Sequence, residues 1–478
     1  MILFFRSQEG SVVAVKTSGE LSQENLESLK WLLGGAELAE GERIEGTFTG
    51  PRREMITPWS TTAVEITQNM NIAGIERMEE FLENREGETV HFDKMLQRVY
   101  NGLDQELFTI VHEPEPVVNI ENLQEYNEKE GLALSPDEIK YLEDLSIRLG
   151  RPLTDGEVFG FSQVNSEHCR HKIFNGRFIV NGVEMESTLF KLIKKTSAEN
   201  PNRIVSAYKD NCAFLEGPKV TLFHPASGDK PDRFITHEEE TVISLKAETH
   251  NFPTTVEPFN GAATGSGGEI RDRMAGGRGS YPVAGTAVYM TSYPRFEVEG
   301  RDWENTPERD WLYQTPQEIL TKASNGASDF GNKFGQALIC GSLLTFEHSE
   351  GWKSYGYDKV IMQAGGIGYA KKLSALKYSP ETGDKVVVMG GDNYRIGMGG
   401  GAVSSVATGE FDNSIELNAV QRSNPEMQKR VYNAIRALAE GEDNPIISVH
   451  DHGAGGHLNS LSELVEETGG TIHIDKLP

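Results

Sequence analysis

The sequence predicts a multidomain α+β protein, and three observations lead to this fold class. The chain has 478 residues, the length of about three domains. Apolar β-branched runs such as Thr241–Leu245 occur beside segments of helical spacing such as Met427–Leu438. The segment Glu113–Pro116 and a change of pattern near Lys371 mark domain boundaries.

Composition narrows the class of protein. The net charge of -26 argues against nucleic acid as a partner, because phosphates would be repelled. No apolar run approaches the ~18 residues that span a bilayer, and the apolar start at Met1 is too short for a signal peptide. The three widely spaced cysteines indicate a reducing compartment, so we expect a cytoplasmic protein with no membrane partner. Cys169 lies between two histidines, but zinc modules usually pair CxxC motifs and the chain has none.

Residues 1–118 are predicted to form a small α+β domain without candidate catalytic or binding residues. The expected strands are Met1–Phe5, Glu42–Thr49 and Thr62–Thr67. The expected helices are Ser22–Leu33, Ile75–Leu82 and Phe92–Leu103.

Residues 119–200 are predicted to form an acidic and helical linker. It is acidic up to about Leu134, and Ser135 then starts a helix as an N-cap, with Glu138 completing a capping box and Gly150 ending the helix. Thr154 and Glu157 form a second capping box. The polar run that follows, Phe161–Lys172, is either a solvated helical face or a segment that points His168 and His171 into a cleft.

Residues 201–372 are predicted to form the next domain. Strands are expected at Val220–Phe223, Thr241–Leu245 and Val283–Met290, and a helix at Thr315–Ala323. The small-residue segment Asn325–Gly335 is expected to be a loop, either an ordinary one or one that lines a ligand before the apolar run Ala337–Gly341.

Residues 373–478 are predicted to form a last domain that is short for its kind, so we expect the sequence to continue beyond Pro478. The expected elements are a buried strand Lys385–Gly391, a turn Gly397–Gly401, a helix Met427–Leu438, a strand Ile446–Val449 and a helix Leu458–Glu466. Between the last two lies His450–Gly456, which carries Asp451. A strand, an Asp-bearing glycine turn and a helix are typical of a site that faces phosphate or metal, although a plain βα turn has the same pattern.

The stretch Lys246–Ser280 is the most informative part of the chain. Its glycines, Gly261, Gly265, Gly267 and Gly268, are expected to form a turn whose N–H groups approach a polyphosphate. The alternative is a glycine-rich surface turn with a solvated charge cluster. A Walker A loop requires Lys-Ser or Lys-Thr after the glycines, and a dinucleotide fingerprint requires a βαβ unit; neither is evident here.

The charged residues around these glycines suggest the chemistry of the site. Glu248 and Asp272 offer carboxylates to a hard cation. Lys246 and Arg271 can contact phosphate. His250 can move a proton near neutral pH.

Several motifs occur in one order along the chain. They are SEHCRHK (166–172), the run 246–272, GGRGS (276–280), NKFGQAL (332–338), AGGIG (364–368), NAVQRSNPEMQKR (418–430) and HDHGAGG (450–456). Together they closely resemble the formylglycinamide ribonucleotide amidotransferase family, also called phosphoribosylformylglycinamidine synthase, in its large single-chain form. The resemblance spans nearly the whole chain and is most specific from Phe161 onward. In the first ~115 residues the resemblance to the family's N-terminal domain rests on position in the chain and on a rough pattern only.

The resemblance implies a domain order and a reaction. The domains would be an N-terminal domain (1–118), a helical linker (119–200), an aminoimidazole-ribonucleotide-synthetase-like (PurM-like) ATP-binding domain (201–372) and part of the matching C-domain (373–478). The family forms an amidine from the amide of formylglycinamide ribonucleotide, with ATP, Mg²⁺ and glutamine-derived ammonia, through an iminophosphate, in purine biosynthesis. The second synthetase half and the glutaminase, normally on the same chain, are not in this sequence.

The resemblance also implies residue roles. His250 and His168 would be catalytic, with His250 the proton acceptor. Glu248, Asp272 and Asp451 would bind Mg²⁺. Thr249, Asn251, Phe252, Pro253, Arg271 and Gln421 would hold the ribonucleotide substrate. ATP would contact Lys246, His171, Cys340, Gly341, Ser342 and the segment Gly261, Ala262, Ala263, Thr264, Gly265, Ser266, Gly267, Gly268, Glu269, Ile270, Arg271 and Asp272. The short form of the enzyme carries a Tyr at the position of His171.

Two other functions are compatible with the sequence. One is a related cycloligase or phosphotransferase of the same superfamily, although such chains lack the SEHCRH segment and the N-terminal domain. The other is a nucleotide-binding or assembly module without turnover, since the family's site draws on both synthetase halves and this chain carries one.

Overall fold

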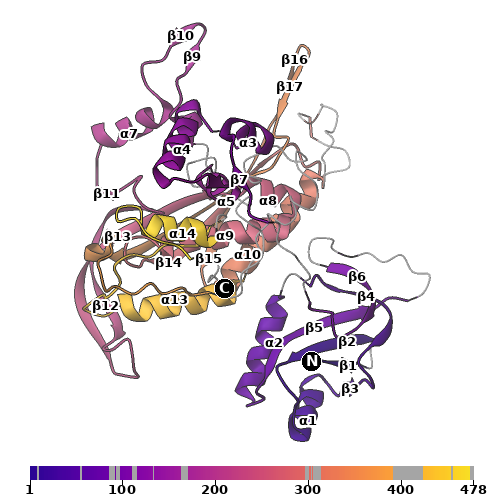
Figure 1. Ribbon diagram of the computed structural model, residues 1–478. Helices are drawn as coiled ribbons and strands as arrows, with labels where there is room; N and C mark the ends of the chain where they lie inside the picture. The colour runs from indigo at the N-terminus through magenta and orange to yellow at the C-terminus, as the bar shows by residue number, and fades with distance from the viewer. Residues whose placement is uncertain are drawn as a thin grey trace. The chain divides into compact units, whose positions relative to one another are not determined.

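The computed structural model describes residues 1–7, 10–53, 56–85, 92, 97–109, 116–132, 134–162, 171–296, 301–302, 304, 314–390, 424–453 and 456–473. The chain divides into two compact units, one within residues 1–116 and one from residue 117 onward. Both contain helices and strands, which confirms the α+β class (Figure 1). Among the described residues, no helix is both long and apolar enough to cross a bilayer.

The first unit is an antiparallel six-stranded sheet with two helices. In sheet order its strands are β3 (Glu37–Leu38), β1 (Ile2–Arg6), β2 (Ser11–Thr17), β5 (Ile75–Glu83), β4 (Ile44–Pro51) and β6 (Gln97–Leu103). Its helices are α1 (Gln23–Leu32) and α2 (Pro58–Asn69). One core cluster packs Leu29 and Ala63 of the helices against the sheet, and a second holds Phe48, Phe81 and Tyr100.

Three predicted elements of this unit are wrong in type. Ile75–Leu82 forms strand β5 and Phe92–Leu103 contains strand β6, where helices were expected, while Thr62–Thr67 lies within helix α2 and is not a strand. In β5 the charged residues Arg77 and Glu79 are buried as an ion pair with a 3.1 Å separation. Apolar residues alone therefore do not show the strand's period of two.

The second unit begins with short elements. They are β7 (Asn119–Ile120), α3 (Leu123–Glu130), α4 (Pro136–Leu149), β8 (Leu153–Thr154), α5 (Asp155–Ser162), α6 (His171–Phe174), β9 (Ile179–Val180), β10 (Val183–Glu184) and α7 (Leu189–Glu199). The capping box of Ser135 and Glu138 and the left-handed Gly150 are confirmed. The acidic segment before Leu134 forms helix α3, which the sequence analysis did not foresee.

A six-stranded sheet carries the candidate site. In sheet order its strands are β11 (Ile204–Ser206), β12 (Ala213–Pro225), β13 (Phe234–Thr249), β18 (Ile361–Lys371), β14 (Tyr281–Thr291) and β15 (Ala337–Thr345). Only the β14–β15 pairing among these is parallel. The strands predicted at 220–223, 241–245 and 283–290 are confirmed as parts of β12, β13 and β14.

Helices cover this sheet in layers. Helix α9 (Pro258–Met274) packs against β13, β14 and β18, α10 (Pro316–Phe334) packs on α9, and α13 (Pro425–Ala439) packs on α10. Figure 1 shows α13 and α14 (Gly456–Leu464), in yellow, beside this layer. The other elements are α8 (Asn251–Val256), the hairpin β16 (Glu347–Glu350) and β17 (Lys353–Gly356), and the 3₁₀ turn η3 (Lys372–Ser374).

Three further predictions are corrected in this unit. Asn325–Phe334 is the second half of α10, with Gly335 as its left-handed C-cap, and is not a loop. Residues 385–390 are irregular, and Val386, Val387 and Val388 are each more than half exposed, so the predicted buried strand is absent there. Ile446–Val449 is also irregular, because the carbonyls of Ile446 and Ile447 accept from Arg278 and from the Tyr378 amide and not from a neighbouring strand. The predicted turn at 397–401 lies outside the described residues.

Candidate functional site

The centre of the site is an ammonium group between two carboxylates. Lys246 and Glu248 are two residues apart on β13 and therefore point to the same side of the strand. There they meet Asp272, near the C-terminal end of α9. The Lys246 Nζ lies 2.5 Å from Asp272 Oδ2 and 3.1 Å from Glu248 Oε2. Glu248 and Asp272, which the sequence placed in one site, therefore do converge.

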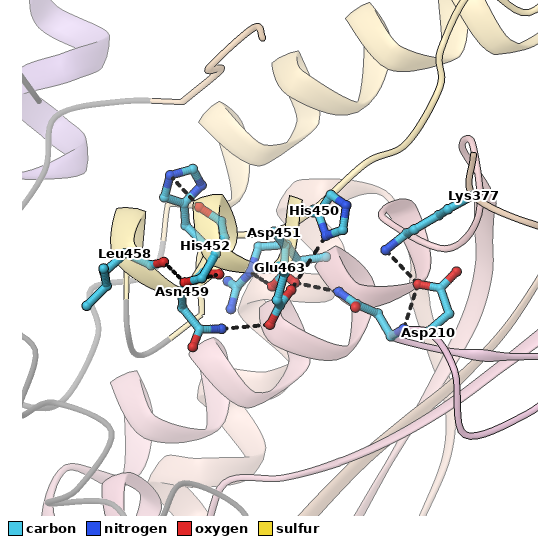
Figure 2. Close-up of polar contacts among 12 residues, drawn as sticks. Asp210, Lys377, His450, Asp451, His452, Leu458, Asn459 and Glu463 are labelled. Atoms are coloured by element: carbon cyan, nitrogen blue, oxygen red, sulfur yellow. Dashed lines mark hydrogen bonds and ion pairs between the residues drawn. The ribbon is translucent and has the colours of Figure 1, made fainter. Parts of the chain in front are cut away.

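Asp451 adds a third carboxylate from a distant part of the chain. Its Oδ2 lies 2.7 Å from Arg271 Nε, and its Oδ1 accepts a hydrogen bond of 2.6 Å from the Asn211 amide. Figure 2 shows Asp451 among the side chains of this region, with His450 turned toward Glu463, whose Oε2 lies 3.6 Å from His450 Nδ1. The segment carrying Asp451 has no regular structure, so these side-chain contacts hold the carboxylate in place.

The two aspartates have opposite pKa shifts. Burial, and after it the neighbouring Asp451 carboxylate, raise the pKa of Asp272 to about 8 against the opposing effect of Lys246. Burial also disfavours charge on Asp451, but Arg271, Asp272 and Lys246 together outweigh this and lower the pKa of Asp451 below its usual value. The two neighbouring carboxyl groups therefore differ in how readily each holds a proton, Asp272 more readily than Asp451.

Lys246 stays protonated at the centre of this cluster. Burial alone would lower its pKa, but Asp272 and Glu248 together raise it above the usual value. The cluster thus holds a fixed positive charge beside two interacting acids.

The carboxylates suit a hard cation, although they are not arranged as ligands of one. No set of three or more His, Cys, Asp or Glu side chains in the described part of the chain has the arrangement of a metal site. Asp272 and Asp451 nevertheless interact with each other, and Mg²⁺ is usually held by one or two carboxylates together with substrate phosphates. These two oxygen donors, with Glu248 next to them, fit Mg²⁺ chemically.

His250 lies where β13 ends and α8 begins. Its backbone N–H donates to Met362 O at 2.9 Å, and its Nδ1 lies 2.5 Å from Gly261 O. A carbonyl oxygen can only accept a hydrogen bond, so Nδ1 carries the proton and Nε2 is the basic atom of the neutral ring. The ring is thus fixed in the tautomer that a proton acceptor at Nε2 requires.

The predicted substrate-binding residues beside His250 differ in exposure. Thr249 is exposed at the end of β13, and Asn251 Oδ1 accepts from the Met362 amide at 3.1 Å. Phe252 and Pro253 are buried in the core. Arg271 is engaged with Asp451, as described above.

The glycine segment is not a turn, and this prediction is wrong. Residues 261–270 lie inside helix α9 and are all buried, so their N–H groups do not form an exposed anion-binding nest. The glycines are needed for close packing. A Cβ at Gly261 would lie 2.4 Å from the backbone of Pro253, and one at Gly267 would lie 2.5 Å from the ring of Phe330.

Glu269, which was predicted to contact ATP, has a structural partner. It forms a 2.7 Å ion pair with Arg273 in the core and accepts a hydrogen bond of 2.7 Å from Gln336. Arg273 also donates to Gln336 and, at 2.6 Å, to Ile367 O. This buried network ties α9 to the sheet, and only Arg271 and Asp272 at the end of the helix reach the charged cluster.

The remaining predicted residues lie elsewhere or outside the described residues. Cys340, Gly341 and Ser342 are exposed on edge strand β15, where Cys340 Sγ lies 3.4 Å from Thr286 Oγ1. His168 and Gln421 are outside the described residues, and His171 begins helix α6 with a side chain that is not described.

Sequence reasoning did not identify Asn211. It follows Asp210 in an unremarkable polar segment, and its partner lies 240 positions further along the chain. No local spacing indicates such a contact; only the fold brings the two residues together.

Comparisons with known proteins agree with this architecture in three parts of the chain. Residues 11–107 match the sequence model described as the formylglycinamide ribonucleotide amidotransferase N-terminal domain, and residues 123–172 match the linker domain of that enzyme. Residues 381–478 match the model of the C-terminal domain of proteins related to AIR synthase.

Solved structures from Thermotoga maritima resemble the chain more distantly. PurL complexed with FGAR is 24% identical with a TM-score of 0.41, and the match covers 69% of this chain and 42% of that one. PurL complexed with ATP is 20% identical with a TM-score of 0.38, covering 69% and 40%. PurLQS is 21% identical with a TM-score of 0.38, covering 68% and 39%. The chain thus spans about two fifths of the length of these proteins, and at such scores the likeness identifies no function.

Proposed function

The chain belongs to the formylglycinamide ribonucleotide amidotransferase family, and on that premise we propose that it carries part of the ATP-dependent synthetase of that enzyme, a carbon–nitrogen ligase of purine biosynthesis. The amide oxygen of formylglycinamide ribonucleotide attacks the γ-phosphorus of ATP, giving an iminophosphate and ADP. Ammonia then adds to the carbon of the former amide group and phosphate leaves, giving the amidine. Glutamine supplies the ammonia through a glutaminase, which acts with the synthetase in the cytoplasm.

One observation carries the proposal: four separate parts of the chain bring charged and polar groups to one half-buried point. Residues 246–248, 271–272 and 451 supply three carboxylates and two cations, and Asn211 supplies an amide. Perturbed buried acids of this kind cluster at functional sites. A purely structural ion pair would not require three acids and two cations together.

The residues have distinct proposed roles at this point. Lys246 and Arg271 place positive charge where phosphate oxygens of ATP bind, and Arg271 also holds Asp451. Asp272, Asp451 and Glu248 hold Mg²⁺, which when bound neutralises charge on the transferring phosphoryl group. His250 Nε2 accepts the proton that the attacking ammonia releases, because its Nδ1 already donates to Gly261 O.

The test is an ammonia-driven assay of the chain with formylglycinamide ribonucleotide and Mg-ATP, in which ADP and amidine are both measured. Asp272→Asn removes one carboxylate and keeps its shape, so we expect ADP formation to fall about 100-fold or more. Asp329→Asn is the matched control, because Asp329 pairs with Lys333 on the surface of α10. The control variant should keep full activity.

Three other results would replace this proposal. ADP formation that accompanies ring closure of an amidine substrate, without amidine synthesis, would indicate the related cycloligase. ATP binding by calorimetry with no ADP release would indicate a nucleotide-binding or assembly module. Full turnover by Asp272→Asn would show that the acid cluster is not the metal site.

A further inference from the structure

We propose that Asn211 is a positioning residue that orients the carboxylate of Asp451 toward the bound cation. The inference rests on the proposed function of the cluster. It concerns Asn211, which lies in none of the segments that supply the charged residues of the cluster. Asn211 Nδ2 donates to Asp451 Oδ1 at 2.6 Å, while Arg271 Nε occupies the other oxygen, Oδ2, at 2.7 Å. The two donors together fix the rotation of the carboxylate.

The segment that carries Asn211 is itself held firmly. Asp210 Oδ1 lies 2.6 Å from Lys377 Nζ, and Asp210 Oδ2 accepts from the Gly277 amide at 2.7 Å. Figure 2 shows Asp210 and Lys377 facing each other next to the Asp451 cluster. The Asn211 backbone amide donates to Asp210 Oδ1 at 2.8 Å, and Cys212 on the other side is buried in the core. Asn211 therefore presents its amide from a fixed backbone.

The segment that carries Asp451 is held at residues 444–447, before it reaches Asp451. Residues 444–453 have no regular structure, so no strand ladder fixes the Asp451 backbone. Without the Asn211 amide, Oδ1 loses this donor, and the carboxylate can rotate more freely about its contact with Arg271. Groups that orient a metal ligand in this way are worth about 10- to 100-fold in metal affinity.

The type of the residue at position 211 also fits this role. An amide donates a hydrogen bond without adding charge, so it leaves the charge of the cluster to Lys246, Arg271 and the acids. Both oxygens of Asp451 have lone pairs beyond the one that each hydrogen bond uses, so a carboxylate held by Asn211 and Arg271 can still bind a cation.

The experiment compares two asparagines of the same unit. Asn211→Leu keeps the volume and removes the donor. Asn444→Leu is the matched control, because Asn444 Nδ2 donates to Arg278 O at 2.8 Å and to Ser374 Oγ at 3.2 Å, and so holds the start of the segment that carries Asp451 without touching the carboxylate. ATP binding to the full chain is measured by calorimetry over a range of MgCl₂ concentrations, and hydrogen exchange is measured for residues 446–453.

We expect both variants to speed exchange in residues 446–453, while only Asn211→Leu raises the Mg²⁺ concentration for half-maximal ATP binding, by about tenfold. An unchanged Mg²⁺ requirement in Asn211→Leu would overturn the inference, as would unchanged exchange. If the unmodified chain binds ATP without any dependence on Mg²⁺, the proposed metal site fails, and the exchange data still decide whether Asn211 holds Asp451. Should Asn211→Leu not fold, Asn211→Ser, whose shorter side chain cannot reach Asp451, is measured in the same way.

Discussion

Single residues in this protein owe their charge state to one or two neighbours. Asp272 and Asp451 are chemically identical and lie in the same cluster, yet the pKa of Asp272 is raised to about 8 and that of Asp451 is lowered. The printed ion pair of Arg271 is with Asp451, whose Oδ2 lies 2.7 Å from Arg271 Nε. Position relative to a guanidinium therefore contributes to the opposite directions of the two shifts.

The pair of Arg151 and Glu157 allows this logic to be tested away from the site. Arg151 donates to both Glu157 oxygens, at 2.9 and 2.7 Å, and together with hydrogen bonds from Thr154 it lowers the pKa of Glu157 from 4.5 to about 2. Because the folded pKa lies below the unfolded one, the stabilisation is present above about pH 4.5 and is lost as the pH falls toward 2. Glu157→Gln should therefore speed hydrogen exchange in α5 at pH 7 by about two- to fivefold, a modest effect because the pair is solvent-screened.

The same experiment has an internal check. The difference in α5 between Glu157→Gln and the unmodified chain should shrink as the pH is lowered through this window. Glu143→Gln, which removes an exposed acid from helix α4, should leave exchange in α5 unchanged at every pH. A difference that persists at pH 2 would contradict the pKa assignment.

At the scale of residues, the sequence allowed the reactive side chains of the candidate site to be predicted, but not their contacts with residues far away in the chain. Lys246, Glu248, His250, Arg271 and Asp272 could be predicted to act together because they lie within one short stretch. Asp451 could be predicted from its glycine-rich context and the family resemblance. Asn211 could not, because a side-chain amide in a polar segment has no distinctive spacing and its role depends on a contact made only in the folded chain.

At the scale of elements, α9 shows how composition can mislead. Four glycines within eight residues favour a turn by intrinsic propensity, yet residues 258–274 are helical and mostly buried. Packing stabilises the helix, since α9 approaches α8 and α10 at distances that a side chain on these glycines would prevent. Tertiary contacts therefore override local preference, and the expected phosphate-binding turn becomes a core helix.

Substitutions at two glycines of α9 can separate the effect of helix propensity from the effect of tertiary packing. Gly261→Ala places a Cβ 2.4 Å from the Pro253 backbone, which cannot move cheaply, whereas a Cβ at Gly268 meets nothing closer than 3.8 Å. Alanine favours a helix over glycine by about 1 kcal/mol at either position. We expect Gly268→Ala to raise the free energy of unfolding by up to about 1 kcal/mol and Gly261→Ala to lower it by about 1–3 kcal/mol in urea titrations. Equal effects at the two positions would show that packing does not explain the glycines.

Capped helices were the elements that could be predicted best. The helices that begin after Ser22, Ser135 and Thr315 start where the sequence placed them, because an N-cap side chain is a local signal. The segment Ile75–Leu82 was misassigned because its strand buries the charged residues Arg77 and Glu79. The segment Ile446–Val449 was misassigned because it has the composition of a strand but does not pair with one. Both errors depend on which residues pack beside the segment in the folded chain, and a single sequence does not record this.

At the scale of the whole molecule, the hydrophobic cores separate the chain into independent parts. Two of the described core clusters use residues between 2 and 108 alone, and four use residues between 120 and 449. Since no described cluster contains residues of both units, each unit buries its own apolar surface. The burial that drives folding is therefore local to each unit.

This separation predicts two unfolding transitions. Calorimetry of the full chain should resolve them, and residues 1–116 expressed alone should unfold within about 3 °C of one of the two. Phe81→Leu, which loosens the packing of Phe81 against Tyr100, should lower only that transition by several degrees, because each kcal/mol lost shifts the midpoint of a domain this size by about 4–8 °C. Phe330→Leu, in the core formed by α9, α10 and α13, should lower only the other transition. A single transition that both substitutions shift equally would mean that the two units fold as one, and residues 1–116 would then be unfolded on their own.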